Sequence, residues 1–164
     1  MTIRQYQESD HTELARLIRI LQEHIAALDP LERQITGTTF DANVYIDLLI
    51  ERIERETGVI FVAETDGKLV GFVAGTIQQQ DEDPAERLAA ISSITGRVLE
   101  LVVDSTYRSR SIGTELMETM EKYFHKNDCI LVRVNCFAPN AGAHAFYEKL
   151  GYSDRAIDLV KMLE

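Results

Sequence analysis

Residues 99–116, with the sequence LELVVDSTYRSRSIGTEL, form the most informative stretch of the chain. An apolar strand pattern passes here through a short polar turn straight into the apolar repeat of a helix. The first turn of a helix leaves backbone N–H groups unpaired and carries a partial positive charge, so it binds phosphate groups. Arg108 and Arg110 precede this helix, and Gly113 in its first turn lets an anion approach the backbone. The stretch predicts either a pyrophosphate site or an ordinary turn with two solvated arginines.

Working outward from this stretch, hydrophobic periodicity predicts the element order β-α-α-β-β-β-α-β-α-β. Asp66-Gly67 is typical of a tight hairpin, which makes its two strands antiparallel, and the strand–helix–strand crossover over 97–137 adds a parallel pair. The predicted fold class is α/β, with a mixed central sheet flanked by helices. The expected strands cover 2–7, 59–64, 68–77, 97–104, 129–137 and 156–163. The first expected helix runs from Asp10 to its stop at Asp29 and Pro30, the second, which contains Tyr45, Leu48 and Leu49, ends near Thr57, and the last two cover 111–127 and about 141–150.

Composition and charge exclude several classes of protein. The chain has 164 residues, which fits a single domain over 1–164. Its 45% hydrophobic and 27% charged residues are typical of a globular protein and exclude a disordered or collagen-like chain. The net charge of −10 disfavours binding to nucleic acid and anionic lipid, and favours cationic partners. The patterns GxxxxGK[ST] and GxGxxG after the first strand are absent, which disfavours P-loop and Rossmann nucleotide sites.

The cysteines and histidines give no sign of a disulfide framework or a metal site. Cys129 and Cys136 lie in one apolar run, where on a strand they would point to opposite faces, and we expect reduced thiols. The four histidines have no metal-ligand spacing with them, so no metal is expected, and His144 is expected at the surface. No apolar run approaches the roughly 20 residues of a membrane span, and the first residues lack the apolar region of a signal peptide. We therefore expect a cytoplasmic protein that binds no membrane.

Two spaced motifs resemble those of a known family. Residues 108–113, RSRSIG, resemble the [RQ]xxGx[GA] acetyl-CoA signature of the GCN5-related N-acetyltransferase (GNAT) family. Residues 140–152, NAGAHAFYEKLGY, resemble the NxxAxxFYxxxGF element of the same family. The two motifs occur in the family's order, separated by one strand, and the predicted element order also agrees with the GNAT fold. The resemblance covers nearly the whole chain, although the first 57 or so residues match in architecture only.

This resemblance implies acetyl-CoA as the acetyl donor. The strand backbone at Leu101 and Val103 would hold the pantetheine arm, in a slot where this strand splays from the strand over 129–137, and the backbone of 108–114 would hold the pyrophosphate. Asn140 would contact the cofactor, cap the following helix, or do both. The implied acetyl-CoA-binding residues are Leu101, Val102, Val103, Arg108, Ser109, Arg110, Ser111, Ile112, Gly113, Thr114, Asn140 and Phe146.

The phosphate-binding turn departs from the family pattern at two positions. Ser109 and Ser111 stand where the family prefers glycine. A Cβ atom narrows both the accessible backbone conformations and the room for a phosphate group. The serine hydroxyls can instead donate hydrogen bonds to phosphate oxygens, so we expect a working site.

The implied reaction is attack of a neutral amine on the thioester, through a tetrahedral intermediate, with a thiolate leaving. Tyr147 matches the family's general acid, which protonates the sulfur; the alternative is a core tyrosine on an amphipathic helix. Glu100 is a carboxylate within an apolar strand, where an unpaired charge is costly, so it faces a wet cleft or has a partner. Strand alternation predicts that Glu100 lies on the face opposite Leu99 and Leu101. It would act as the base, anchor the substrate, or simply face solvent.

The acceptor is less defined by the sequence. The acidic residues 81–83 and Glu86 would steer a small cationic amine, or form a solvated loop face. Asn135 occupies the position of the glutamate base in ribosomal-protein N-terminal acetyltransferases of the family, which argues against that mechanism. The alternatives are a non-catalytic sensor that binds CoA or an acyl-CoA, and an acetyltransferase acting on a protein amine. Homodimers are common in the family, and a homodimer is one expectation here.

Overall fold

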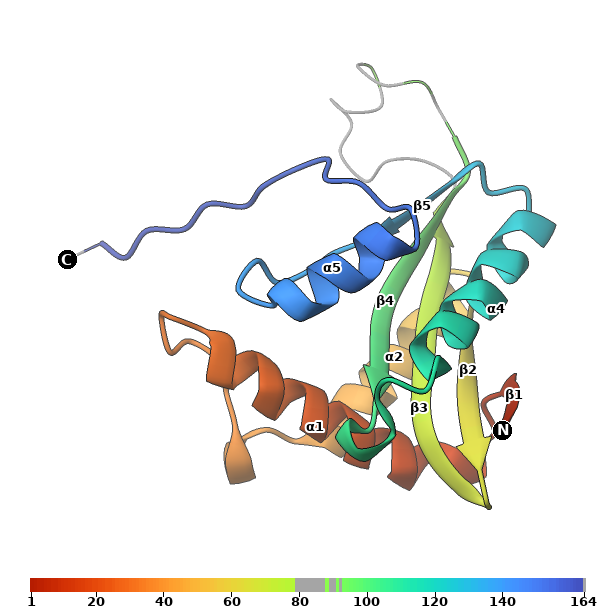
Figure 1. Cartoon of the computed structure of the whole chain (residues 1–164), viewed down its shortest axis with the longest axis horizontal. Coiled ribbons are helices and arrows are strands. Elements are labelled where there is room, and N and C mark those ends of the chain that lie inside the picture. The colour runs from red at the N-terminus through yellow and green to blue at the C-terminus, as the bar shows by residue number, and fades with distance from the viewer. Residues whose placement is uncertain (79–87, 89–90, 92, 164) are drawn as a thin grey trace.

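The strands form one mixed sheet. The computed structural model describes residues 1–78, 88, 91 and 93–163. Five strands lie side by side in chain order, and all neighbours are antiparallel except β4 and β5, which are parallel (Figure 1). This arrangement confirms the predicted mixed α/β sheet. The strands are β1 (Thr2–Gln5), β2 (Gly58–Thr65), β3 (Lys68–Gln78), β4 (Thr95–Val103) and β5 (Leu131–Val134).

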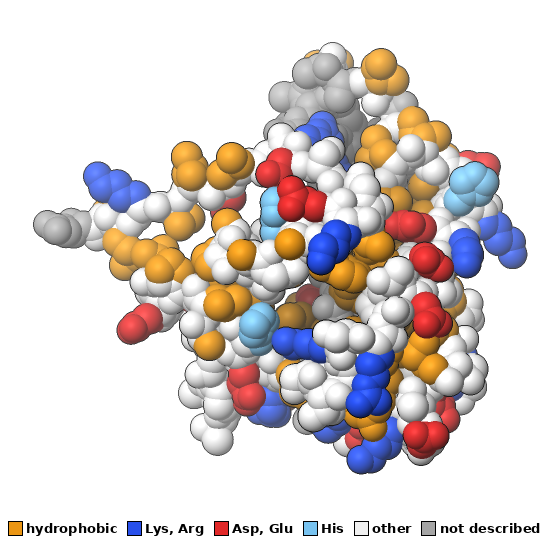
Figure 2. All heavy atoms as spheres, viewed as in Figure 1, with side chains coloured by type: hydrophobic (Ala, Val, Ile, Leu, Met, Phe, Trp, Pro, Cys, Tyr) orange, Lys and Arg blue, Asp and Glu red, His pale blue; other side chains and the backbone are white. Residues whose placement is uncertain are grey.

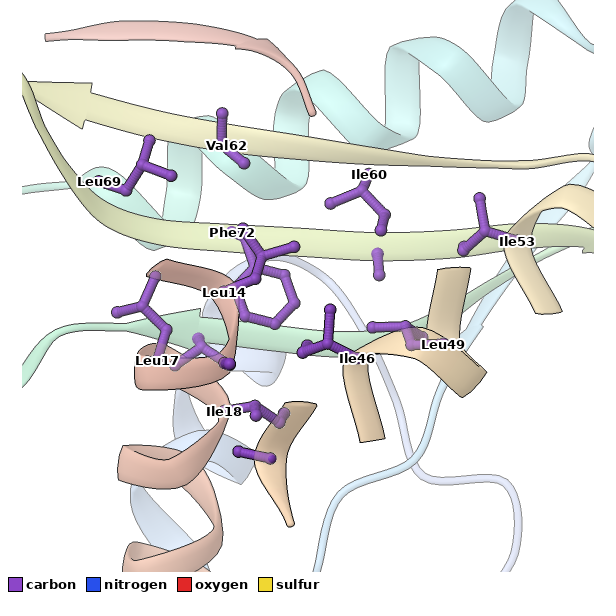
Figure 3. Close-up of a cluster of buried hydrophobic side chains, with 14 residues drawn as sticks. Leu14, Leu17, Ile18, Ile46, Leu49, Ile53, Ile60, Val62, Leu69 and Phe72 are labelled. Atoms are coloured by element: carbon purple, nitrogen blue, oxygen red, sulfur yellow. The ribbon is translucent and has the colours of Figure 1, made fainter. Parts of the chain in front are cut away.

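Helices cover the two faces of this sheet. Helices α1 (His11–Leu28) and α2 (Ala42–Arg55) pack on one face through a cluster of buried side chains, shown in Figure 3. Their apolar residues recur at helical spacing, so each helix turns a single stripe toward the strands. The side chain of Asp41 caps α2 by accepting from the amides of Asn43 and Val44. Phe72 of β3, fully buried, lies at the centre of this cluster.

The opposite face carries α4 (Ile112–Lys126), with α5 (Ala141–Lys149) beside it. Gly75 and Gly96, on neighbouring strands, make room for the buried ring of Phe124. A Cβ atom on Gly96 would lie 2.4 Å from Cγ of Phe124, and one on Gly75 would lie 2.7 Å from its Cζ. These two glycines therefore let the end of α4 sit directly on the sheet.

Several predicted elements are confirmed, and some have different limits. Asp66 and Gly67 both have positive φ, 52° and 74°, as a tight hairpin turn requires. The strand predicted over 129–137 is much shorter, since β5 covers only Leu131–Val134. Cys129 and Cys136 therefore flank the strand, and the prediction that they lie on it is wrong. No helix in the described parts of the chain is both long and apolar enough to span a membrane.

The predicted last strand, over 156–163, is wrong. These residues form no strand and run away from the sheet as an extended arm (Figure 1). Their apolar side chains alternate as in a half-buried strand, yet Ile157 is 78% exposed and Leu159 is 87% exposed. Alternation supplies the pattern of a strand, but a strand also needs a neighbouring edge to pair with. The described residues offer this arm none.

Candidate active site

Strand β4 has two halves with different surroundings. Its first half pairs with β5 over four positions, from Thr95 opposite Leu131 to Val98 opposite Val134. Beyond Val98, β4 continues beside β3 alone, because the chain after β5 moves away. The described structure therefore confirms the splay of these strands that the family resemblance implied. Figure 2 shows this face of the molecule hollowed between α5 and α1.

The second half of β4 presents an open backbone edge. The amide of Asp104 donates to the carbonyl of Val70 on the β3 side, at 2.8 Å. Backbone groups alternate in direction along a strand, so Val102 also faces β3, whereas Leu101 and Val103 face the open side. The Val103 carbonyl on that side accepts from Nε of Arg108, at 3.3 Å. Val102 differs from its neighbours, because its side chain is buried in the core formed with α1 and α2.

The turn after β4 leads into a helix start whose first backbone amides have no partner among the described residues. Ser109 and Ser111 both have φ of 62°, in the left-handed region that favours glycine. Within the described residues, no hydrogen bond uses the amides of Ile112, Gly113 and Thr114, the first three of α4. Free amides at a helix N-terminus attract phosphate oxygens. The turn thus adopts the left-handed conformation that glycine favours, although serines stand at both positions.

The two sequence motifs meet at Gly113. A Cβ atom on Gly113 would lie 3.3 Å from Cζ of Phe146 and 3.8 Å from Cγ2 of Val103. The absence of a side chain there lets the first turn of α4 approach α5 and the end of β4. Asn140 caps α5 by accepting from the Ala143 amide at 3.2 Å, which confirms the capping role considered for it.

Glu100 lies in a pocket on the α2 side of the sheet. In the pairing of β3 with β4, Ala74 faces Glu100 and Gly75 faces Val98, so Leu99 is an extra residue in a β-bulge. The bulge breaks the alternation, and Leu99 and Glu100 line the same pocket. The prediction that Glu100 lies opposite Leu99 is wrong for this reason, whereas Leu101 does pack on the other face.

The pocket has a volume of about 280 Å³. The hydroxyl of Tyr45 donates a hydrogen bond to the Glu100 carboxylate from α2. Burial raises the pKa of Glu100, while the hydrogen bond from Tyr45 acts in the opposite direction. A carboxylate with a raised pKa is a stronger base, which suits proton abstraction from an ammonium group. The pocket is lined by Tyr45, Leu48, Leu49, Arg52, Arg97, Val98, Leu99, Glu100 and Asn135.

Tyr147 lies on the buried side of α5. Its ring packs edge-on against Phe146 and Tyr152, with centroids 5.4 Å and 5.8 Å away. Burial raises the pKa of Tyr147, and the electrostatic effects of Cys136 and Glu100 act in the same direction. The described residues leave its hydroxyl without a hydrogen bond. Tyr147 thus holds its proton at neutral pH and lies within electrostatic reach of Glu100.

Several other predicted residues lie outside this pocket. His144 pairs with Asp154 at 2.8 Å on the surface of α5, as expected, and this contact raises its pKa. Among the described residues, no group of three or more His, Cys, Asp or Glu side chains could hold a metal ion. Burial raises the pKa of both free cysteines, so neither is activated as a nucleophile. The acidic residues 81–83 and Glu86 lie outside the described residues.

Sequence reasoning missed three residues of the pocket: Tyr45, Arg52 and Arg97. In the sequence, Tyr45 looks like one more residue on the apolar face of α2. Nothing near it in the chain shows that its hydroxyl contacts a carboxylate 55 positions away. Arg97 is a single charge in a strand, with no motif around it. A signal does exist on α2, where positions 45, 48, 49 and 52 follow the i, i+3, i+4, i+7 spacing of one helix face.

The comparisons with known proteins agree with this geometry. The family model described as the acetyltransferase (GNAT) family matches residues 25–152. The chain belongs to the GNAT acetyltransferase family. It is therefore an N-acetyltransferase whose donor is acetyl-CoA. Which molecule accepts the acetyl group is not determined by this membership.

Individual relatives and solved structures are similar to this GNAT protein over most or all of its length. An uncharacterized N-acetyltransferase of Methanocaldococcus jannaschii is 26% identical over 132 residues, which are 80% of this chain and 73% of that protein. A mutant of a Bacillus halodurans protein has the same fold, with a TM-score of 0.82, 21% identity and 100% of both chains covered. An aminoglycoside N-acetyltransferase solved with CoA has a TM-score of 0.68 and 16% identity, over 99% of this chain and 100% of that one.

The residues present fit acetyl-CoA. The open edge of β4 offers the backbone groups of Leu101 and Val103, and the start of α4 offers three free amides. Arg108 and Arg110 add positive charge beside these amides, and Arg110 is held over the ring of Tyr107, 5.2 Å from its centroid. Acetyl-CoA has a peptide-like pantetheine arm followed by a pyrophosphate. This order matches the open strand edge of β4 followed by the N-terminus of α4.

Proposed function

We propose that this GNAT protein transfers an acetyl group directly from acetyl-CoA to a primary amine of a small molecule. Glu100 is the general base and Tyr147 the general acid. The observation that carries the proposal is the position of Glu100, whose carboxylate lines a pocket beside the point where β4 leaves β5. The pocket then holds the acceptor, and the open strand edge holds the donor, on the two sides of one opening.

The donor supplies the acetyl group as a thioester. Leu101 and Val103 hold its pantetheine arm through the open edge of β4, and the turn 108–111 with the first amides of α4 holds its pyrophosphate. Gly113 and Phe146 support this arrangement by packing the start of α4 against α5. Asn140 keeps α5 capped, which fixes the helix that carries Tyr147.

The acceptor amine must lose a proton before it attacks. At neutral pH an alkyl amine is protonated, so a base within the pocket is needed. Glu100 accepts this proton, and the hydroxyl of Tyr45 keeps the carboxylate oriented. Tyr147 gives its phenolic proton to the departing sulfur. Its raised pKa keeps the proton in place until negative charge develops on that atom.

The size of the pocket supports a small acceptor. A volume of about 280 Å³ is near the lower end of ligand pockets in proteins. Asn135 lines this pocket, so the position that carries a glutamate base in one protein-acetylating group of the family has no carboxylate here. The solved aminoglycoside N-acetyltransferase acts on a small amine. These points favour a small molecule over a protein amine.

The test is thiol release from acetyl-CoA by the wild type and by Tyr147→Phe, with a panel of polyamines, aminosugars, amino acids and short peptides. We expect amine-dependent release that falls strongly in the variant. CoA binding by calorimetry without release on any acceptor would instead identify a sensor. Release with peptides alone would identify a protein amine as the acceptor.

A further inference from the structure

We propose that the acceptor carries an anionic group, a phosphate or a carboxylate, in addition to its amine, and that Arg52 and Arg97 bind this group. The inference rests on the proposed function, in which Glu100 marks the position of the amine. It adds an anionic group to the small cationic amine expected from the acidic residues 81–83 and Glu86. The acceptor then has a positive charge at the amine and a negative charge at its other end.

One face of α2 lines the pocket from the base to the first arginine. Tyr45 contacts Glu100, and Arg52 lies two turns further along the same face. Two turns of helix correspond to roughly 10 Å along the axis. Leu48 and Leu49 lie between these two residues and make the wall apolar. The α2 side of the pocket thus joins an acidic end and a basic end.

The β4 side repeats this order. Arg97 lies three residues before Glu100, which corresponds to about 10 Å along a strand. Val98 and Leu99 separate the two charged side chains in the pocket wall. Two independent elements therefore place an arginine at a similar distance from the same carboxylate. A compact acceptor can reach both ends at once.

Both arginines have guanidinium N–H groups that no described residue uses as hydrogen-bond donors. Arg52 binds Glu56 through Nε alone, at 3.0 Å and 3.1 Å, which fixes the guanidinium and leaves its two terminal nitrogens unused within the described residues. Arg97 has no hydrogen bond or ion pair to any residue that the structure describes. Guanidinium groups bind phosphate and carboxylate through paired N–H donors. An arginine in a pocket wall that no described residue pairs with is available to bind such an anion.

Among the lining residues that the structure describes, there is no second carboxylate that would repel this anion. Glu100 is the single acidic member of that described set, against two arginines. Glu56 lies beyond Arg52 and is shared with Arg55, whose side chain is 71% exposed and does not line the pocket. Arg55 is therefore a matched control, because it loses the same ion-pair partner without changing the pocket.

The experiment compares amine acceptors with and without an anionic group. Initial rates with acetyl-CoA are measured for 2-aminoethanol, its phosphate ester and 3-aminopropanoate, for glucosamine and its 6-phosphate, and for spermidine. The proteins are the wild type, Arg97→Gln, Arg52→Gln and Arg55→Gln. In parallel, inorganic phosphate is titrated by calorimetry into each protein saturated with CoA, so that the pyrophosphate site is already filled.

We expect the wild type to favour the anionic member of a pair by about tenfold or more in kcat/KM. Arg97→Gln and Arg52→Gln should lose that preference and should also lose phosphate binding. Arg55→Gln should keep both. The phosphate esters and 3-aminopropanoate show which anion is bound.

A preference for spermidine or neutral amines, or an unchanged preference in Arg97→Gln, would overturn the proposal. If no acceptor in the panel reacts, phosphate binding decides, and equal binding by the wild type and Arg97→Gln would overturn it as well. Failure of the proposed function is seen separately, as CoA that does not bind or amines that never increase thiol release.

Discussion

The two halves of β4, TGRV over Thr95–Val98 and LELVV over Leu99–Val103, differ in sequence and in surroundings. From Thr95 to Val98 the strand has a neighbour on each side, and Gly96 and Val98 are buried. From Leu99 to Val103 it has a neighbour on one side only, and a bulge turns Glu100 into a pocket. One strand thus supplies both part of the core and part of the candidate active site.

The difference shows how an open strand edge gains a role in binding. Unpaired N–H and C=O groups at an edge can form hydrogen bonds with another strand, and proteins usually cover or block them. Here the edge is open on the side of α5 (Figure 1), where a peptide-like arm can pair with it. Changes at Gly96, in the first half, should therefore affect stability, and changes around the second half, or at Arg97 in the pocket wall, should affect turnover.

The largest expected effect is that of Glu100→Gln on turnover. A positioned base contributes about 100- to 10,000-fold, so we expect kcat/KM to fall by about 1000-fold. Since burial raises the pKa of Glu100, the wild-type rate should rise with pH through a value above the ordinary glutamate pKa. The variant should lack this rise. A profile of kcat/KM against pH for both proteins is the measurement.

The same substitution has a stability counterpart. A carboxyl whose pKa is raised in the folded state loses stability as the pH rises from its unfolded pKa through its folded pKa. The glutamine side chain can still accept from Tyr45 and carries no charge. Denaturant unfolding should therefore show the variant at least as stable as the wild type at pH 7. Equal turnover of the two proteins would contradict the role of Glu100.

The next effect in size is that of Tyr147→Phe. Loss of the proton donor should lower kcat by about 100-fold, because a general acid contributes at least this factor. The ring contacts with Phe146 and Tyr152 survive, so the unfolding temperature should change little. Tyr152→Phe is the control, since it loses the hydrogen bond to Glu121 on α4 and should cost stability while keeping most of the activity.

In the paired half of β4, Gly96→Ala should mainly cost stability. The new Cβ would meet the ring of Phe124 at 2.4 Å, and overpacking of this kind costs about 1–3 kcal/mol of unfolding free energy. Gly142→Ala in α5 is the matched control, with its nearest neighbour 3.8 Å away and an expected gain of about 0.5–1 kcal/mol. Urea unfolding measures both. An unfolding free energy of Gly96→Ala equal to that of the wild type would show that the paired half is less tightly packed than described.

The smallest effect is expected for Ser109→Gly and Ser111→Gly. Each serine has φ of 62°, a conformation that costs roughly 1 kcal/mol for a residue with a side chain. Removing the Cβ should raise the unfolding free energy by less than about 1 kcal/mol, because glycine also adds entropy to the unfolded chain. CoA should bind a few-fold more tightly. Ser105→Gly, in the short helix before the turn, should destabilise instead.

The sequence predicts the parts of the site that depend on local chemistry. The turn 108–113 and the α5 motif are read directly from residue type and spacing, and both lie where the resemblance implies. The face of Glu100 is predicted wrongly, because a bulge depends on how β3 and β4 pair and leaves no mark in β4 alone. The contact between Tyr45 and Glu100, like the arginine pair, arises only when α2 packs on the sheet.

The fold shows the same limit at its C-terminal end. Alternating apolar residues over 156–163 satisfy the pattern of a strand, but pairing is a property of two segments and not of one. Figure 2 shows the apolar side chains of this arm exposed. That residues 1–164 form one domain, that the protein is cytoplasmic and that it forms a homodimer stay predictions.

The most direct test is hydrogen exchange of the β4 amides, measured by NMR with and without CoA. The account predicts that the amides of Leu101 and Val103 exchange fast in the free protein and become protected when CoA binds. The amides of the paired half, Thr95–Val98, should be protected in both states. CoA binding that leaves Leu101 and Val103 unprotected would contradict the claim that the open half of β4 holds the donor.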